Sequence, residues 1–248
     1  MWSPETLGIL IFTFVVAGLV KGVTGMGLPT VALAILAAIF DLAEAMVLML
    51  VPSLVTNIWQ AFAGNALIDI LRRQWLLLVT GSLVTIILGI FSTSVDTAYL
   101  LILLGAVLCL YSVFSLLTPQ LNLSATGTGW LPAAMGAIAG TITGLTGTFV
   151  VPAVPYFQAL GLRPHVLIQT MGVWFTLATL SLGVGLNTNG NLTGEFIQLS
   201  TFAIAPALAG MWIGQRVRNK LPEQKFRTIF FLTLFVLGLY IAFKAILS

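Results

Sequence analysis

Hydrophobic residues fill eight long stretches of the chain, and short polar or charged segments separate these stretches. Six of them are about 20 residues long, which is the length that an α-helix needs to cross the hydrocarbon core of a bilayer. The pattern therefore predicts an all-α polytopic membrane protein. The stretches cover residues 6–40, 45–64, 74–94, 97–117, 129–160, 165–186, 196–215 and 227–246.

The first and fifth stretches are longer, at about 32–35 residues, than a single helical crossing at 1.5 Å per residue requires. Both are interrupted near the middle by glycine-rich segments. Non-helical backbone at membrane depth is tolerated only where protein buries it or where it lines a water-filled cavity. We therefore predict that each long stretch is a re-entrant or broken helical hairpin with arms of about 15 residues.

Composition agrees with a membrane protein. Hydrophobic residues make up 59% of the 248 residues and charged residues only 7%, whereas a soluble domain carries about 25% charged residues. The net charge of +3 comes from basic residues between the stretches and indicates membrane topology rather than nucleic-acid binding. Cys109 is the only cysteine, so an intramolecular disulfide and a cysteine-based metal site are excluded. The first residues lack the basic segment and cleavage site of a removable signal peptide.

An internal repeat relates the two long stretches. The pattern A-G-x-x-x-G-x-T-G occurs at residues 17–25 and again at 139–147. We infer a tandem duplication of a four-segment unit, with repeats at 1–120 and 126–248 joined near 118–128 within one membrane domain. Glycine-interrupted segments at matching positions of two repeats indicate the binding site of a transporter. Two further motifs recur at similar spacings: Gly64-Asn65 with Gly190-Asn191, 126 residues apart, and Leu-x-Leu-Tyr at 108–111 with 237–240, 129 residues apart.

The distribution of charge favours re-entrant hairpins. If both long stretches return to the side they entered from, the basic and acidic residues fall on opposite sides; if both stretches cross, the basic groups separate. The positive-inside rule then places the basic side in the cytoplasm and both termini outside. Because each repeat crosses an odd number of times, the repeats would be inverted. The basic set is Arg72, Arg73, Arg163, Arg216, Arg218, Lys220, Lys225 and Arg227, and the acidic set is Glu5, Asp41, Glu44, Asp96 and Glu195.

The glycine turns are the strongest candidates for a binding site. A helix that restarts after a break offers free N–H groups and the positive end of its dipole, which together favour an anion. We expect such restarts near Pro29 and Pro152, because proline suits the first helical turn. The alternative is that the G-x-x-x-G spacing only allows close helix packing. That alternative involves Gly18, Gly22, Gly140 and Gly144.

Lys21 is the strongest single candidate for a substrate-binding residue. It lies deep in the first stretch, and the next charged residue, Asp41, is 20 positions away. A charged side chain inside a membrane costs on the order of 3 kcal/mol or more and is a functional hypothesis by default. The alternative is that its ammonium group reaches the interface or meets backbone carbonyls. The repeat places Thr143 at the matching position, so the predicted site is asymmetric.

Polar residues inside two other stretches could line the same cavity or merely hydrogen-bond between helices. No Asp or Glu lies at the centre of any stretch, so a carboxylate proton relay is not visible. The sequence predicts no cofactor and no metal. The predicted substrate-binding residues are Lys21, Thr24, Gly25, Gly27, Asn57, Gln60, Thr143, Thr146, Gly147, Thr148, Gln169 and Thr170.

Taken as a set, these motifs resemble the sulfite exporter TauE/SafE family of permeases over nearly the whole chain. The family usually shows a richer glycine run after the first turn, where this chain has Leu28-Pro29 and Phe149-Val150. The resemblance implies transport of small sulfur-containing anions such as sulfite or organosulfonates. It rests on Gly18-x-x-x-Gly22-x-Thr-Gly25-x-Gly27, Gly140-x-x-x-Gly144-x-Thr-Gly147, Gly64-Asn65, Gly190-Asn191 and the basic segment before the last stretch.

The leading hypothesis is a secondary carrier that holds a small anion at the two glycine turns in one shared cavity near the bilayer midplane. The alternatives are an uncoupled anion channel or a carrier of another small organic anion. An intramembrane enzyme and a purely structural subunit explain the matched broken segments less well. The expected partners are the anion and the lipid bilayer of the cell membrane. The coupling ion (H⁺ or Na⁺) and assembly into a homo-oligomer stay open.

Overall fold

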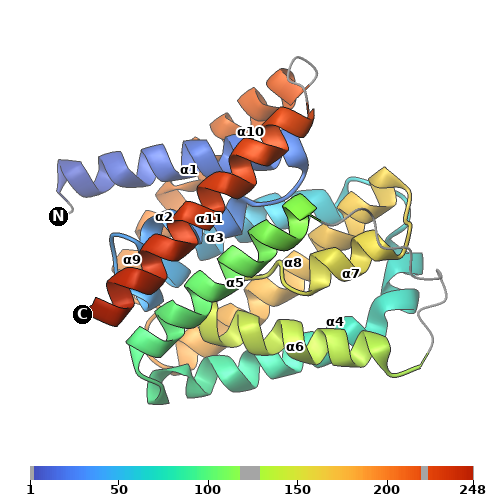
Figure 1. Ribbon diagram of the computed structural model, residues 1–248, viewed down its shortest axis with the longest axis horizontal. Coiled ribbons are helices and arrows are strands. Elements are labelled where there is room, and N and C mark those ends of the chain that lie inside the picture. Colours follow the sequence, from blue (N-terminus) through green and yellow to red (C-terminus); the bar gives the residue numbers. More distant parts are fainter. Residues whose placement is uncertain (1–2, 118–128, 219–222, 248) are drawn as a thin grey trace. The chain divides into compact units, whose positions relative to one another are not determined.

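The computed structural model of the chain describes residues 3–117, 129–218 and 223–247, and this part of the chain is helical with no strand. Figure 1 shows the helices in chain order. The predicted joint between the repeats at 118–128, as well as Lys220, lies outside the described residues. The prediction of an all-helical fold is confirmed.

The first repeat begins with a long helix, a glycine-containing break and a short helix, and three longer helices follow. The break falls where the sequence predicted it, between residues 24 and 28. The elements are α1 (Pro4–Thr24), α2 (Leu28–Ala37), α3 (Leu42–Phe62), α4 (Leu67–Phe91), the short 3₁₀ helix η1 (Ser92–Ser94) and α5 (Thr97–Leu117).

The second repeat has the same order of elements. A long helix, a break and a short helix again come first, and the third stretch of this repeat is divided into two helices at Ala203. The elements are α6 (Leu131–Thr146), α7 (Ala153–Ala159), α8 (Pro164–Thr188), α9 (Gly194–Phe202), α10 (Ile204–Arg218) and α11 (Glu223–Leu247). Among the described residues, seven helical segments are long and apolar enough to cross a membrane. The chain is therefore a multi-pass membrane protein.

Two details of the sequence prediction were wrong. The arms of the broken stretches are not about equal, because α1 and α6 have 21 and 16 residues whereas α2 and α7 have 10 and 7. Arg72 and Arg73 were expected in a loop, but they lie in the second turn of α4. Helical structure extends there past the apolar stretch because arginine is a good helix former.

The helices form two compact units, and each unit takes segments from both repeats. The first unit contains Met1–Pro52, Leu101–Leu117 and Thr193–Ser248, and the second contains Ser53–Leu100 and Thr118–Leu192. In the first unit α1 packs along α10, and in the second unit α6 packs along α4; α4 and α6 run side by side in Figure 1. The opening helix of each repeat is thus paired with a helix from the third stretch of the other repeat.

Glycines allow both of these helix pairs to approach closely. A Cβ atom on Gly18 would lie 2.1 Å from the carbonyl oxygen of Ala207 on α10. A Cβ atom on Gly140 would lie 2.5 Å from the carbonyl oxygen of Gly81 on α4. Small residues at membrane helix interfaces let the backbones pack together in this way. The packing interpretation is therefore confirmed for the first two glycines of each motif, which include Gly22 and Gly144.

A proline interrupts the hydrogen-bond ladder of α3, and a serine from α9 repairs it. Pro52 lies inside α3 and has no N–H to donate to the carbonyl of Leu48. The hydroxyl of Ser200 donates to that carbonyl at 2.8 Å instead. The same hydroxyl accepts from the backbone N–H of Val51 at 3.0 Å. Ser200 is fully buried, so it satisfies backbone groups that water does not reach.

We expect Ser200→Ala to lower the thermal stability of the purified protein. The substitution leaves the Leu48 carbonyl unsatisfied, which costs about 1–3 kcal/mol for a buried polar group. In a Pro52→Ala background the new backbone N–H can reach Leu48, so Ser200→Ala should then cost less. Melting temperatures of the four proteins in the cycle measure this coupling. Thr201→Ala, at the neighbouring exposed hydroxyl, is the control. An equal loss from Ser200→Ala in the wild-type and Pro52→Ala backgrounds would contradict the proposed role of Ser200.

Candidate anion-binding turns

The first turn begins where α1 ends at Thr24. Gly25 has a φ of 78°, a left-handed conformation that favours glycine, and its N–H donates to the carbonyl of Lys21 at 2.8 Å. The Thr24 hydroxyl donates to the carbonyl of Val20 at 2.9 Å and to that of Met26 at 2.7 Å. It also accepts from the N–H of Met26 at 3.2 Å. The Thr24 side chain therefore stabilises the turn by hydrogen bonds to backbone groups of the turn.

The same turn ends where α2 begins. Gly27 has a φ of 98° and is the residue before the first turn of α2, which contains Pro29. No side chain caps this helix start. The amide of Leu28, the first residue of α2, makes no backbone hydrogen bond within the described part of the chain. The start of α2 therefore has the free N–H character expected of an anion-binding end.

Thr30 is a candidate that the sequence analysis missed. It lies in the first turn of α2, is only 1% exposed, and its hydroxyl has no hydrogen-bond partner among the described residues. Helical side chains lean toward the N-terminus of their helix, which here is the glycine turn. Leaving a buried hydroxyl without a partner costs free energy. The signal in the sequence was weak, because a threonine in an apolar helix is usually bonded to its own backbone.

Lys21 lies in the last turn of α1, four residues before Gly25, and is 4% exposed. The sequence prediction that this lysine is buried is thus confirmed. Its amino group belongs to the same helix end that carries the glycine turn. At the C-terminus of α1 a cation is also favoured by the helix dipole.

The second turn repeats the first in its main features. Gly147 ends α6 with a φ of 74°, and its N–H donates to the carbonyl of Thr143 at 2.8 Å. The Thr146 hydroxyl donates to the carbonyl of Ile142 at 2.7 Å and accepts from the N–H of Thr148 at 3.3 Å. The two Thr-Gly pairs therefore adopt the same left-handed helix end.

The second turn is longer and is held by more side chains. The Thr143 hydroxyl donates to the carbonyl of Thr148 at 2.9 Å, and the indole N–H of Trp174 donates to the carbonyl of Phe149 at 2.8 Å. The hydroxyl of Thr148 is fully buried and has no hydrogen-bond partner among the described residues. The Thr148 hydroxyl is thus the group of this turn that can still form a hydrogen bond to a ligand. The sequence analysis did not identify Trp174, because an indole in an apolar stretch is ordinary.

The predicted cavity residues of α3 and α8 join these two helices. The Gln60 side-chain amide donates to the carbonyl of Ile168 at 2.7 Å. Gln169 donates to the carbonyls of Ala61 and Gly64 at 2.9 and 3.0 Å and accepts from the N–H of Ala66 at 3.0 Å, so it closes the end of α3. The remaining two predicted residues are also buried: Thr170, whose hydroxyl bonds to the carbonyl of Val166, and Asn57.

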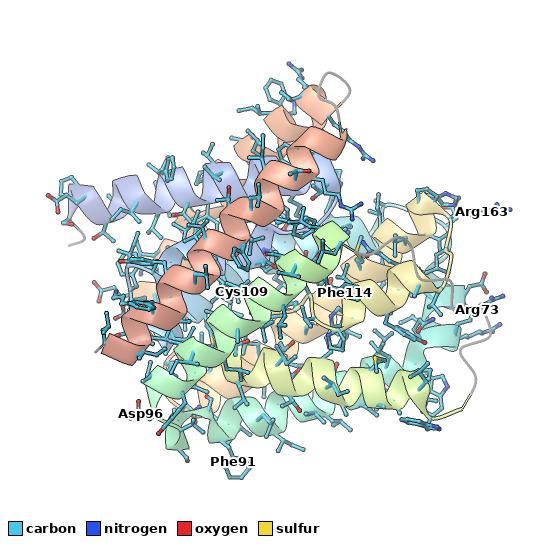
Figure 2. All side chains as sticks on the ribbon, in the orientation of Figure 1. Arg73, Phe91, Asp96, Cys109, Phe114 and Arg163 are labelled. Atoms are coloured by element: carbon cyan, nitrogen blue, oxygen red, sulfur yellow. The ribbon has the colours of Figure 1, made fainter. Side chains whose placement is uncertain are left out.

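Charged residues lie at the two ends of the second unit. Figure 2 shows Arg73 and Arg163 at one end and Asp96 at the other. Arg163 comes directly before α8, and Asp96 comes directly before α5. Within this unit Arg73 and Arg163 therefore lie apart from Asp96, but Asp69 lies in the first turn of α4, one turn before Arg72 and Arg73. The sidedness of the charged residues stays a prediction.

The comparison with protein families decides the identity of the fold. The family model for the sulfite exporter TauE/SafE matches residues 10–241, which is nearly the whole chain. The chain belongs to this family. Comparisons with curated proteins and with solved structures found no significant match.

Membership of the TauE/SafE family confirms the resemblance that the glycine motifs indicated. It also makes the chain a member of a family of membrane transporters. In this TauE/SafE protein the structure brings Lys21, Thr24, Gly25 and Gly27 together at one helix break. It brings Thr143, Thr146, Gly147 and Thr148 together at the second break, in the other compact unit. A role of these residues in substrate binding stays a prediction.

Proposed function

We propose that the chain is a secondary transporter that exports a small sulfur-containing anion, such as sulfite or an organosulfonate, across the cell membrane. The observation that carries this proposal is the repeated helix break, with a left-handed glycine directly after a threonine at the helix end in both repeats. A break of this kind is expensive inside a membrane unless it contacts protein or a hydrated substrate path. The TauE/SafE family supplies the substrate class.

The chemistry of the first turn fits an oxyanion. The uncapped start of α2 presents N–H groups at the positive end of a helix dipole. The Thr30 hydroxyl adds a buried donor, and Lys21 adds a buried amino group four residues before Gly25, where a bound anion would favour its charged form. In this proposal the N–H groups and the hydroxyl replace water around the oxygens of the anion. Thr148 offers the corresponding buried donor at the second turn.

An uncoupled anion channel, or a carrier of another small organic anion, is the alternative. The charge distribution that supports cytoplasmic basic segments does not distinguish these mechanisms. Transport measurements in proteoliposomes, with an anion gradient opposed to a proton or sodium gradient, distinguish a coupled carrier from a channel. A coupled carrier shifts its reversal potential when the H⁺ or Na⁺ gradient changes, whereas a channel follows the anion gradient alone. Flux of labelled sulfite, a sulfonate and a carboxylate in the same vesicles establishes the substrate class.

We expect Lys21→Ala to abolish anion transport, or to weaken it strongly, while the protein remains inserted and folded. The substitution removes the only charge of the first turn and relieves the cost of burying it. Lys21→Arg keeps the charge but changes the shape and should retain part of the activity. Initial flux of the labelled anion against its concentration measures the effect. Wild-type affinity in Lys21→Ala would remove this lysine from the site.

A further inference from the structure

The tyrosine of the repeated Leu-x-Leu-Tyr motif has different surroundings in the two repeats. Tyr111 on α5 is 4% exposed, whereas Tyr240 on α11 is 53% exposed. The tyrosine in the first repeat therefore lies inside the protein. Its equivalent in the second repeat lies on the surface that faces outward. A motif that is buried in one copy and exposed in the other indicates a role that only the first copy has.

Tyr111 contacts the first glycine turn at its central residue. The Tyr111 hydroxyl donates to the sulfur of Met26 with an oxygen–sulfur distance of 3.7 Å. The carbonyl of the same methionine accepts from the Thr24 hydroxyl at 2.7 Å. Met26 is thus held by its side chain from α5 and by its backbone from α1. Both contacts lie within the first compact unit.

Aromatic rings from α11 complete the support of this turn. Phe231 packs edge-on against the Tyr111 ring, with the ring centroids 5.2 Å apart. Phe230 packs against Phe231 at 4.9 Å, and a Cβ atom on Gly27 would lie 3.6 Å from the Phe230 ring. Edge-to-face aromatic pairs at these separations are favourable beyond the area that they bury.

A basic residue fixes the helix that carries the tyrosine. The guanidinium of Arg227, near the start of α11, donates to the carbonyl of Ser115. Ser115 lies four residues after Tyr111, one turn further along α5. Arg227 therefore ties the end of α5 to α11, and this tie keeps the tyrosine and Phe231 in register.

We propose that Tyr111 is a positioning residue that holds the first glycine turn in its binding conformation through Met26. The proposal rests on the proposed function, in which the first turn binds the anion. The amide groups at the start of α2 follow Met26 directly, so movement of this residue changes where they point. Among the described residues Tyr240 has no such hydrogen bond to a turn, and the second turn is instead held by Trp174 through the Phe149 carbonyl. The two repeats thus use different aromatic donors to anchor their turns.

The test compares Tyr111→Phe with Tyr240→Phe, because the two substitutions remove the same hydroxyl from equivalent positions of the repeat. Transport of labelled sulfite into proteoliposomes gives KM and the maximal rate. We expect Tyr111→Phe to raise KM about twofold to tenfold, the range for one lost hydrogen bond, while the protein stays folded. Tyr240→Phe should leave KM unchanged. Equal KM values for the wild type and Tyr111→Phe, or equal changes in both variants, would overturn the proposal.

A double-mutant cycle with Met26→Leu identifies the contact itself. Leucine keeps most of the side-chain volume and removes the sulfur acceptor. If the tyrosine acts through Met26, then Tyr111→Phe has no further effect on KM in the Met26→Leu background. An undiminished effect in that background would show that the tyrosine acts through another group and would overturn the assignment.

Hydrogen exchange separates failure of this proposal from failure of the proposed function. Tyr111→Phe should speed amide exchange in residues 25–30 by several-fold, and Tyr240→Phe should not. This readout needs no substrate. If the wild type transports no sulfur-containing anion but exchange still accelerates, the proposed function fails and the positioning contact stands. If exchange is unchanged, the positioning role is wrong whatever the protein transports.

Discussion

Replacing Gly25 or Gly147 by valine should stop anion transport while most of the helical structure is retained. Both glycines have a φ near +75°, where a β-branched side chain is strained by about 1–3 kcal/mol. The valine also places two methyl groups at the turn that is proposed to approach the anion with its bare backbone. Flux of labelled sulfite in proteoliposomes measures the loss. Circular dichroism and gel filtration establish that the variants are folded.

Two other glycines provide a matched control for backbone strain. Gly161 and Gly190 have φ values of 63° and 73°, and a Cβ atom on either would meet nothing within 4 Å. Valine at these positions introduces the same kind of strain away from the two turns, so transport should persist at reduced stability. Equal loss of transport in all four variants would mean that strain alone explains the effect. Full activity in Gly25→Val and Gly147→Val would rule out close approach of the anion to the turns.

Replacing Gly18 or Gly140 by alanine should prevent the protein from folding stably. The added methyl group would overlap with the backbone of α10 or α4, at 2.1 and 2.5 Å from a carbonyl oxygen. Backbone cannot move aside as a flexible side chain can, so the helix pair must separate. Overpacking of this kind costs about 1–3 kcal/mol and occasionally more. Helix association in membranes has little hydrophobic driving force to offset this cost. The yield of monodisperse protein and its melting temperature measure the effect.

Gly8→Ala is the control for this prediction, because it makes the same change on the same helix α1. A Cβ atom on Gly8 meets nothing within 4 Å. Alanine also has the higher helix propensity, so this variant should be as stable as the wild type or slightly more stable. If Gly18→Ala folded as well as Gly8→Ala, the close approach of α1 and α10 would be wrong.

The sequence predicted the helices well because length and hydropathy are local properties. The break after Thr24 and the restart at Leu28 followed from glycine and proline, whose backbone preferences do not depend on neighbours. The roles within the glycine motif were harder to separate. Gly18 needs its contact with α10, whereas Gly25 needs only its own left-handed φ. A glycine in the sequence indicates either close helix packing or a left-handed backbone conformation, and the pattern alone does not distinguish the two.

Contacts between distant segments were beyond the reach of the sequence. The sulfur contact of Tyr111 spans 85 positions, and the Ser200 repair of α3 spans 152. Neither the buried hydroxyl of Thr30 nor the anchoring indole of Trp174 differs in sequence from an ordinary helix residue. These features depend on which helices become neighbours, and the repeat alone did not reveal that each opening helix pairs with the other repeat.

This exchange of partners has a consequence for biosynthesis. The partner of α6 is α4, which leaves the ribosome earlier, but the partner of α1 is α10, which begins 180 residues after α1 ends. At about 5–20 residues per second, α1 waits roughly 10–40 s for its partner. During that interval its row of glycines faces lipid or another nascent helix. The amino-terminal helix is thus among the first to be made and among the last to be docked.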